Sequence, residues 1–187
     1  LNGCWIAIVH NINNTAMKFD AIVGNPPYHE KDGGAGASAL PIYNLFVDIA
    51  KSINPQYISM IIPTRWFSGG KKLNEFRNEM LNDIHISELH DFLNPKVLFK
   101  ETNNRGGICY FLWDKEYDNT KELSKVFTYN DDFIPLVKQR NLRTKNSDIF
   151  IRHSIGVSII EKVQNSQNFE TLSKYISAAK AFGFRTY

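Results

Sequence analysis

The chain has few of the residues that build metal centres or cross-links. Its only cysteines, Cys4 and Cys109, lie far apart among apolar neighbours, which is typical of buried reduced thiols. The five histidines show no metal-ligand spacing, and no paired carboxylates with a lysine indicate a nuclease. The sequence therefore predicts no metal centre. Any restriction activity would have to lie outside these 187 residues.

Long hydrophobic runs are also missing. No stretch of about 18 apolar residues could span a bilayer, and neither a signal peptide nor a lipidation motif is present. These absences predict a cytoplasmic protein with no membrane partner. A formal net charge of +3 and a pI of about 8.8 permit a nucleic-acid partner without requiring one.

Two short apolar runs predict neighbouring strands. Phe19 to Val23 and Ile58 to Ile62 are nearly continuous and rich in β-branched residues, which is typical of strands buried on both faces of a parallel sheet. Between them, Pro41 begins a segment of helical periodicity that Asn54-Pro55 ends. Its predicted apolar face consists of Leu45, Phe46, Ile49 and Ala50. The pattern predicts a β-α-β unit.

A second helix and a pair of strands are expected downstream. The helix covers Lys71 to Leu81, and the strands cover Ile84 to Leu89 and Ile108 to Trp113. The apolar face of this helix is Leu73, Phe76, Met80 and Leu81. The order strand, helix, strand, helix, strand, strand predicts an α/β fold. We place its end at residue 125, because the composition then shifts toward basic and polar residues. A second unit is expected over 126–187.

The most informative segment is Asn25-Pro26-Pro27-Tyr28. The two prolines fix the φ angle at two successive positions, so the loop is stiff. It is predicted to follow a buried strand at the carboxyl edge of a parallel sheet, where α/β proteins bind ligands. The Asn25 side chain and the Pro26 carbonyl offer acceptors to an amino group on a planar heterocycle, which Tyr28 would stack against. Accepting both N–H hydrogens would draw the nitrogen lone pair out of conjugation, toward an electrophile.

The segment Phe19 to Tyr28 resembles the strand and catalytic loop of S-adenosylmethionine-dependent amino methyltransferases. Further segments resemble restriction-modification adenine methylases, in particular the group in which methylase and nuclease share one polypeptide. These segments are Gly33 to Gly36, Ile42 to Phe46, Ile61 to Phe67 and Gly106 to Trp113. The resemblance covers roughly residues 18 to 115, and only the tetrapeptide is specific by itself.

The resemblance implies an α/β fold that is the C-terminal half of a Rossmann-like class I methyltransferase sheet. Residues 1–125 would be a partial catalytic domain, and 126–187 a linker and the start of a target-recognition region. The implied activity is transfer of a methyl group to N6 of an adenine flipped out of double-stranded DNA. The catalytic residues would be Asn25, Pro26, Pro27 and Tyr28, and the base would stack between Tyr28 and Phe99.

The cofactor side is expected to be incomplete. The fold normally holds S-adenosylmethionine with a glycine-rich turn and an acidic residue upstream, and only eighteen residues precede Phe19. Asp20, Asn25 and Pro26 are the nearest candidates for the border of that site. The isolated chain is therefore expected to be inactive. Its partners would be double-stranded DNA and the remainder of the parent polypeptide. That remainder would contain the cofactor half and, in the fused type, a nuclease.

Six basic residues are candidates for contacts with DNA phosphates. One group follows the second strand and the other lies in the basic stretch after the sheet: Arg65, Lys71, Lys72, Lys138, Arg140 and Arg143. Two alternatives remain open. Protein glutamine methyltransferases resemble this sequence through the same tetrapeptide, and a non-catalytic DNA-binding module could keep the fold without the chemistry.

Overall fold

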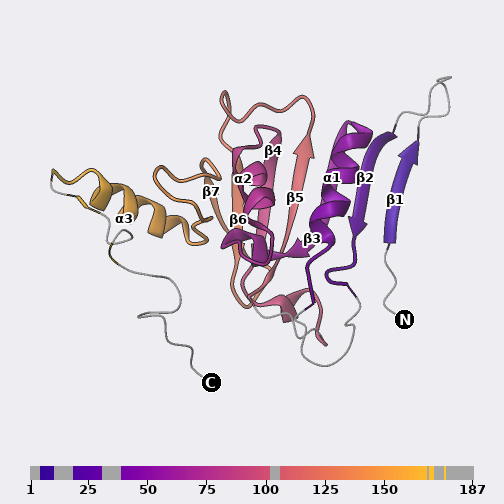
Figure 1. The fold of residues 1–187 in the computed structure, drawn as a ribbon, viewed down its shortest axis with the longest axis horizontal. Coiled ribbons are helices and arrows are strands. Elements are labelled where there is room, and N and C mark those ends of the chain that lie inside the picture. Colours follow the sequence, from indigo (N-terminus) through magenta and orange to yellow (C-terminus); the bar gives the residue numbers. More distant parts are fainter. Residues whose placement is uncertain are drawn as a thin grey trace.

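Seven strands form one sheet in the order β1-β2-β3-β5-β4-β6-β7 (Figure 1). The computed structural model describes residues 5–10, 19–30, 39–101, 106–167, 169–170 and 175. The strands are β1 (Trp5–His10), β2 (Phe19–Asn25), β3 (Tyr57–Pro63), β4 (Ile86–Phe92), β5 (Ile108–Asp114), β6 (Lys125–Tyr129) and β7 (Leu136–Gln139). The helices are α1 (Tyr43–Ile53), α2 (Asn74–Asn82), α3 (Ser154–Gln164) and the 3-10 turns η1 (Thr64–Phe67) and η2 (Pro95–Val97).

The pairing confirms the α/β class. β2 and β3 run parallel with α1 between them in sequence, which is the β-α-β unit of Rossmann-like sheets. β5 lies between β3 and β4 and is antiparallel to both, so the expected strand pair is present. The sheet continues past the predicted boundary at residue 125, because β6 pairs with β4 and β7 pairs with β6. Within the described residues, Gln139 is the last residue of the sheet, and the division of the chain into two regions stays a prediction.

Three local predictions were wrong, each for a physical reason. α2 begins at Asn74 rather than Lys71, because Lys71 and Lys72 have positive φ values of 46° and 65°, outside the right-handed helix. α1 buries Tyr43, Val47 and Ala50, while Leu45 and Ile49 are more than half exposed. The Tyr43 ring packs edge-on against Phe76 of α2, 6.0 Å between centroids, and thereby selects the buried face.

β2 is also not buried on both faces. Ile22 belongs to the hydrophobic core, but Val23, which points to the opposite face, is 47% exposed. α1 and α2 contribute to the same core cluster as the inward-facing residues of β3, β4 and β5. Within the described residues, these helices therefore cover one face of the sheet at β2.

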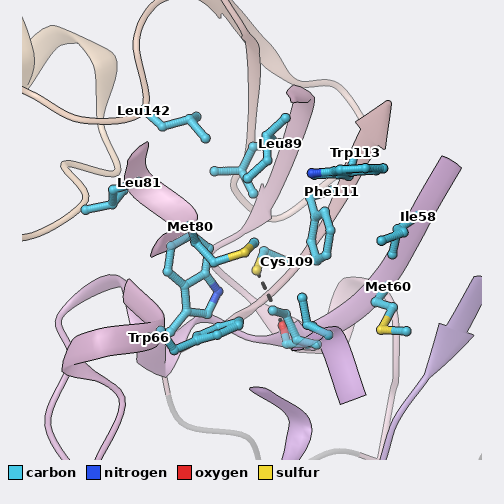
Figure 2. Packing of buried hydrophobic residues seen from close by; sticks show 14 of the residues in the cluster. Ile58, Met60, Trp66, Met80, Leu81, Leu89, Cys109, Phe111, Trp113 and Leu142 are labelled. Atoms are coloured by element: carbon cyan, nitrogen blue, oxygen red, sulfur yellow. Dashed lines mark hydrogen bonds between the residues drawn. The ribbon is translucent and has the colours of Figure 1, made fainter. Parts of the chain in front are cut away.

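The core lies between that face and the two helices (Figure 2). Trp66, Met80 and Phe111 are fully buried in it, and so is Cys109, whose thiol donates a hydrogen bond to the Ile62 carbonyl over 3.5 Å. Burial raises the pKa of the Cys109 thiol well above its usual range. This confirms that Cys109 is a buried, reduced residue, while Cys4 lies outside the described residues.

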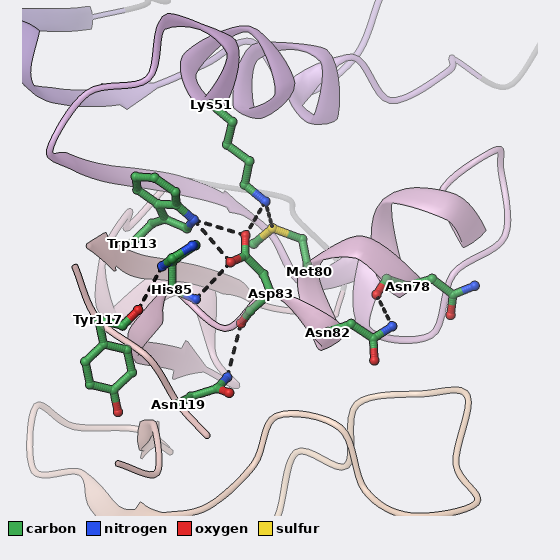
Figure 3. A network of polar contacts seen from close by, with 9 residues as sticks. All are labelled: Lys51, Asn78, Met80, Asn82, Asp83, His85, Trp113, Tyr117 and Asn119. Atoms are coloured by element: carbon green, nitrogen blue, oxygen red, sulfur yellow. Dashed lines mark hydrogen bonds and ion pairs between the residues drawn. The ribbon is translucent and has the colours of Figure 1, made fainter. Parts of the chain in front are cut away.

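Asp83 joins the helices to the sheet at the edge where α2 ends (Figure 3). Its carboxylate forms an ion pair with Lys51 of α1 at 2.6 Å and accepts hydrogen bonds from the Trp113 indole and the His85 backbone N–H. Its carbonyl accepts from the Asn119 amide. These contacts orient α1 and α2 from the end opposite to the Asn-Pro-Pro-Tyr loop.

Candidate active site

The Asn-Pro-Pro-Tyr loop lies directly after β2, at the carboxyl end of the parallel strands β2 and β3. Backbone hydrogen bonds pin it to the segment that leads into α1. The Tyr28 carbonyl accepts from the Ile42 N–H at 3.2 Å, and the Glu30 N–H donates to the Leu40 carbonyl at 3.0 Å. The two prolines stiffen the loop from within, and this short ladder fixes it from outside.

Two buried side-chain groups of this loop are without a hydrogen-bond partner in the described part of the chain. The Asn25 Oδ1 and the Tyr28 hydroxyl are both buried without a partner among the described residues, and Pro26 between them is buried. A buried polar atom without a partner costs on the order of 1–3 kcal/mol, which a bound ligand would recover. Burial, with a smaller contribution from Cys109, raises the pKa of Tyr28 to about 12, so its hydroxyl remains protonated at neutral pH.

A residue that the sequence predictions missed lies beside the loop. The Asn44 Oδ1, in the first turn of α1, is also buried without a partner in the described part of the chain. It lines a cavity of about 190 Å³ with Glu30, Lys71 and Lys72. Asn44 lies inside Ile42 to Phe46, one of the segments that resemble adenine methylases, and that resemblance is the one signal in the sequence that could identify it.

Asp20 does not lie with Asn25 and Pro26. It is exposed at the amino end of β2, and Asn25 ends the strand five residues later. At about 3.3 Å per residue, the two are separated by roughly 16 Å along the strand. The structure therefore brings together only Asn25 and Pro26 of the three residues predicted to border the cofactor.

Phe99 lies in the connection between β4 and β5, just after η2. It is half-buried, and its backbone N–H donates to the Pro95 carbonyl at 2.9 Å. No ring contact joins Phe99 to Tyr28 within the described residues, and 102–105 of the same connection lie outside them. The stacking role of Phe99 stays a prediction.

The six basic candidates separate into two groups. Arg65, Lys71 and Lys72 are exposed and follow β3, at the same sheet edge as the Asn-Pro-Pro-Tyr loop. Lys138 is exposed on β7, and four strands lie between β7 and β2. The structure therefore places only the first group near the loop.

Arg140 and Arg143 are not free basic side chains. Arg140 is only 9% exposed, donates to the Ile151 carbonyl at 2.5 Å and stacks over the Phe150 ring. Burial, opposed by Asp91, lowers its pKa to about 10. Arg143 pairs with Asp148 at 3.4 Å. A surface contact of Arg140 with phosphate, as the sequence predicted, is inconsistent with this burial.

Within the described ranges, no group of three or more histidine, cysteine or acidic side chains could hold a metal ion. In the same ranges, none of the helices has the length and apolar character needed to cross a membrane.

Similar proteins place the chain in a family. The sequence model of the Eco57I restriction-modification methylases matches residues 5–99. An uncharacterised adenine-specific methylase of Mycoplasma pneumoniae is 34% identical over 62% of this chain and 28% of its own length. The type II methyltransferase M.PstI of Providencia stuartii is 25% identical over 94% of this chain and 38% of its own length.

Solved structures of subunits from type I restriction-modification systems are similar to the chain at lower sequence identity. The subunit from Streptococcus thermophilus superposes with a TM-score of 0.43 at 15% identity, over 83% of this chain and 33% of that chain. A modification subunit from Vibrio vulnificus superposes with a TM-score of 0.43 at 14% identity, over 81% of this chain and 32% of that chain.

The sheet and the loop at its carboxyl edge define an α/β protein whose loop carries two buried polar groups without partners among the described residues. The chain belongs to the Eco57I restriction-modification methylase family. It spans about a third of the length of the curated relatives that it matches.

Proposed function

We propose that this chain carries the catalytic loop of a DNA adenine-N6 methyltransferase of a restriction-modification system. The observation that carries the proposal is a pair of buried groups on Asn25 and Tyr28 that have no partner among the described residues. They lie at the carboxyl end of β2 in a chain of this family. The name of the Mycoplasma pneumoniae relative, an adenine-specific methylase, supports adenine as the substrate base.

In the proposed reaction, the adenine is flipped out of the duplex and its amino group enters the loop. The Asn25 Oδ1 and the Pro26 carbonyl accept its two N–H hydrogens, and Tyr28 stacks on one face of the ring. These acceptors shift electron density onto the amino nitrogen as it attacks. Phe99 is proposed to stack on the other face. The amino proton leaves to solvent after transfer.

Bound S-adenosylmethionine would supply the methyl group from its sulfonium and would leave as the neutral thioether S-adenosylhomocysteine. The unpartnered Asn25 oxygen fits the substrate amino group, and Asn25 and Pro26 are the described residues that would border the cofactor. The remaining cofactor contacts, and the nuclease of the fused type, belong in this proposal to other parts of a longer polypeptide.

The proposal is tested with the intact protein and S-adenosylmethionine that carries a labelled methyl group. We expect the label to enter duplex DNA and to be recovered as N6-methyladenine after nuclease digestion. Label in glutamine of a protein substrate instead would favour the alternative of protein methylation. DNA binding without any transfer would favour the non-catalytic module.

Lys72 is expected to contact a DNA phosphate near the loop. It is exposed, and together with Asn44 it lines the cavity beside the loop. Lys72→Gln should reduce the slope of log affinity against log salt concentration by about 1, since each phosphate contact releases counterions. Fluorescence anisotropy of labelled duplex DNA at several salt concentrations measures the slope. Lys115→Gln, an exposed lysine just after β5, is the control and should leave it unchanged; an equal effect of both variants would contradict the assignment.

A further inference from the structure

A cavity of about 470 Å³ lies at the edge of the sheet where α2 ends, and this volume is typical of small-molecule sites. Asn82 and Asn119 line it, and Figure 3 shows both beside Asp83. Arg140 also lines it, directly after Gln139 of β7, which pairs with the first residue of β6. β4 and β6 run in the direction of β2, because β5 is antiparallel to both β3 and β4. The cavity therefore lies at the edge opposite to the Asn-Pro-Pro-Tyr loop.

The segment 140–147, which forms one side of this cavity, is fixed to the sheet. The Arg140 N–H donates to the Ser124 carbonyl at 2.9 Å, just before β6 begins. Leu142 is 1% exposed and belongs to the hydrophobic core. The Ser147 N–H donates to the Thr144 carbonyl at 3.1 Å and closes a turn. These contacts hold the lining residues in place, so the cavity is built into the fold.

Two polar groups of the lining residues are buried without partners. Thr144 is 3% exposed and Arg140 is 9% exposed, and both line the cavity. The Thr144 hydroxyl and the Arg140 Nε have no hydrogen-bond partner among the described residues. A buried polar group without a partner destabilises a fold, and a ligand that forms the missing hydrogen bond removes that cost. Both groups can donate a hydrogen bond, so they favour a ligand that accepts.

The charge of the lining favours an anion. Three cations and one acid line the cavity: Arg140, Arg143, Lys145 and Glu161. Burial lowers the pKa of Arg140 to about 10, with an opposing contribution from Asp91. Both oxygens of Asp91 accept hydrogen bonds from Arg152, at 2.8 and 2.5 Å. Within the described part of the chain, no carboxylate is hydrogen-bonded to Arg140. Its charge is therefore only partly balanced, and an anion in the cavity would balance it further.

The remaining lining has room for more than a phosphate ion. Leu81 at the end of α2 and Val157 of α3 provide apolar surface. Asn82 and Asn119 provide amide groups, which suit the hydroxyl groups of a ligand. A cavity of about 470 Å³ is several times larger than a phosphate group. The lining thus matches a phosphate group that is attached to a small polar organic group.

We propose that this cavity binds a small phosphate ester. The Thr144 hydroxyl donates to the phosphate, and Arg143 and Lys145 contact it from the rim. Arg140 contributes its charge from within; its burial excludes a phosphate on the surface but not an anion inside the cavity. A duplex whose adenine enters the Asn-Pro-Pro-Tyr loop lies at the other edge, roughly 20 Å away along seven-residue strands. The inference is therefore independent of the proposed methyl transfer.

The test measures binding of two probes to the intact protein by isothermal titration calorimetry. The probes are inorganic phosphate and ribose 5-phosphate, which has no base and cannot imitate a flipped adenine. We expect both to bind, with the lower Kd for ribose 5-phosphate, because its sugar fills more of the cavity. Thr144→Val should raise each Kd by about tenfold or more, since a hydrogen bond to a charged group is lost. Lys145→Gln, at an exposed position, should raise each Kd about two- to fivefold.

Thr128→Val is the matched control. Thr128 is 4% exposed on β6 and its hydroxyl also has no partner among the described residues, but Thr128 does not line the cavity. Its variant should leave both Kd values unchanged. Without ligand, neither valine variant should lower the free energy of unfolding, measured with urea, because valine replaces a buried hydroxyl that has no partner. A loss of affinity without a loss of stability would distinguish a binding role of Thr144 from a structural one.

Each other outcome contradicts the inference. Absence of binding of both probes up to millimolar concentrations would overturn it, and so would equal Kd values for Thr144→Val and the unchanged protein. An equal loss of affinity in Thr128→Val would overturn it as well. Displacement of ribose 5-phosphate by duplex DNA would assign the cavity to the DNA backbone instead of a small ligand. If Thr144→Val does not fold, an unchanged Kd in Lys145→Gln overturns the inference.

Discussion

Asn25→Ala is expected to lower the rate of methyl transfer by about 10² to 10³-fold while DNA binding is retained. The Asn25 Oδ1 is buried at the end of β2 without a partner among the described residues, so its removal breaks no hydrogen bond within them. The variant loses an acceptor aimed at the amino group as positive charge develops there, and single groups of this kind contribute about 10² to 10³-fold to kcat. Single-turnover methylation and DNA binding by anisotropy measure the two quantities.

The control is Asn130→Ala, since Asn130 is exposed in the turn after β6. It should leave both transfer and binding unchanged. Asn25→Asp is informative beside it, because a carboxylate keeps the acceptor oxygen but loses the amide donor. A partial rate in Asn25→Asp would support the acceptor role. Methyl transfer at the normal rate in Asn25→Ala would rule out the role that we give to the loop.

The elements that position this site were predictable because they depend on local sequence. The apolar run that ends at Asn25 predicts a strand, and the two prolines predict a stiff loop after it. Both follow from short-range backbone preferences. The β5 strand was predictable for the same reason, since the aromatic-rich run after Gly107 has strong strand propensity.

The features that were not predictable depend on contacts between distant parts of the chain. Arg140 and Arg152 belong to one basic stretch and look alike in the sequence, yet one packs on Phe150 and the other forms an ion pair with Asp91, 61 residues away. The buried face of α1 is set by the contact of Tyr43 with Phe76, not by periodicity alone. Charge density in a sequence therefore does not distinguish a DNA contact from a tertiary anchor.

The turn formed by Gly106 and Gly107 illustrates the same limit. The sequence shows that Gly106 and Gly107 precede a strand, but not that Arg152 and Thr64 both donate to the Gly106 carbonyl. Three segments meet there, after β3, before β5 and before α3. Since each contributes a single residue, no local pattern marks the contact.

Trp66→Ala is expected to cause the largest loss of stability. Trp66 in η1 is fully buried, with its ring centre 4.6 Å from that of Phe67 and 5.9 Å from that of Phe76, both edge-on. Truncating a buried tryptophan removes its apolar burial and leaves a cavity, at a cost of about 3–5 kcal/mol in the free energy of unfolding. Because a domain of this size is stable by only about 5–15 kcal/mol, this cost removes a large fraction of the stability of the fold.

Urea unfolding followed by circular dichroism measures the change. Trp66→Phe should cost less than Trp66→Ala, because a phenyl ring fills part of the space and can retain one of the edge-on contacts. Phe133→Ala is the matched control, since Phe133 is 66% exposed and its truncation should cost less than about 1 kcal/mol. Phe67 follows Trp66 in η1, and its ring centre lies 5.6 Å from the Arg152 guanidinium. An equal loss in the free energy of unfolding for Trp66→Ala and Phe133→Ala would contradict the burial of Trp66.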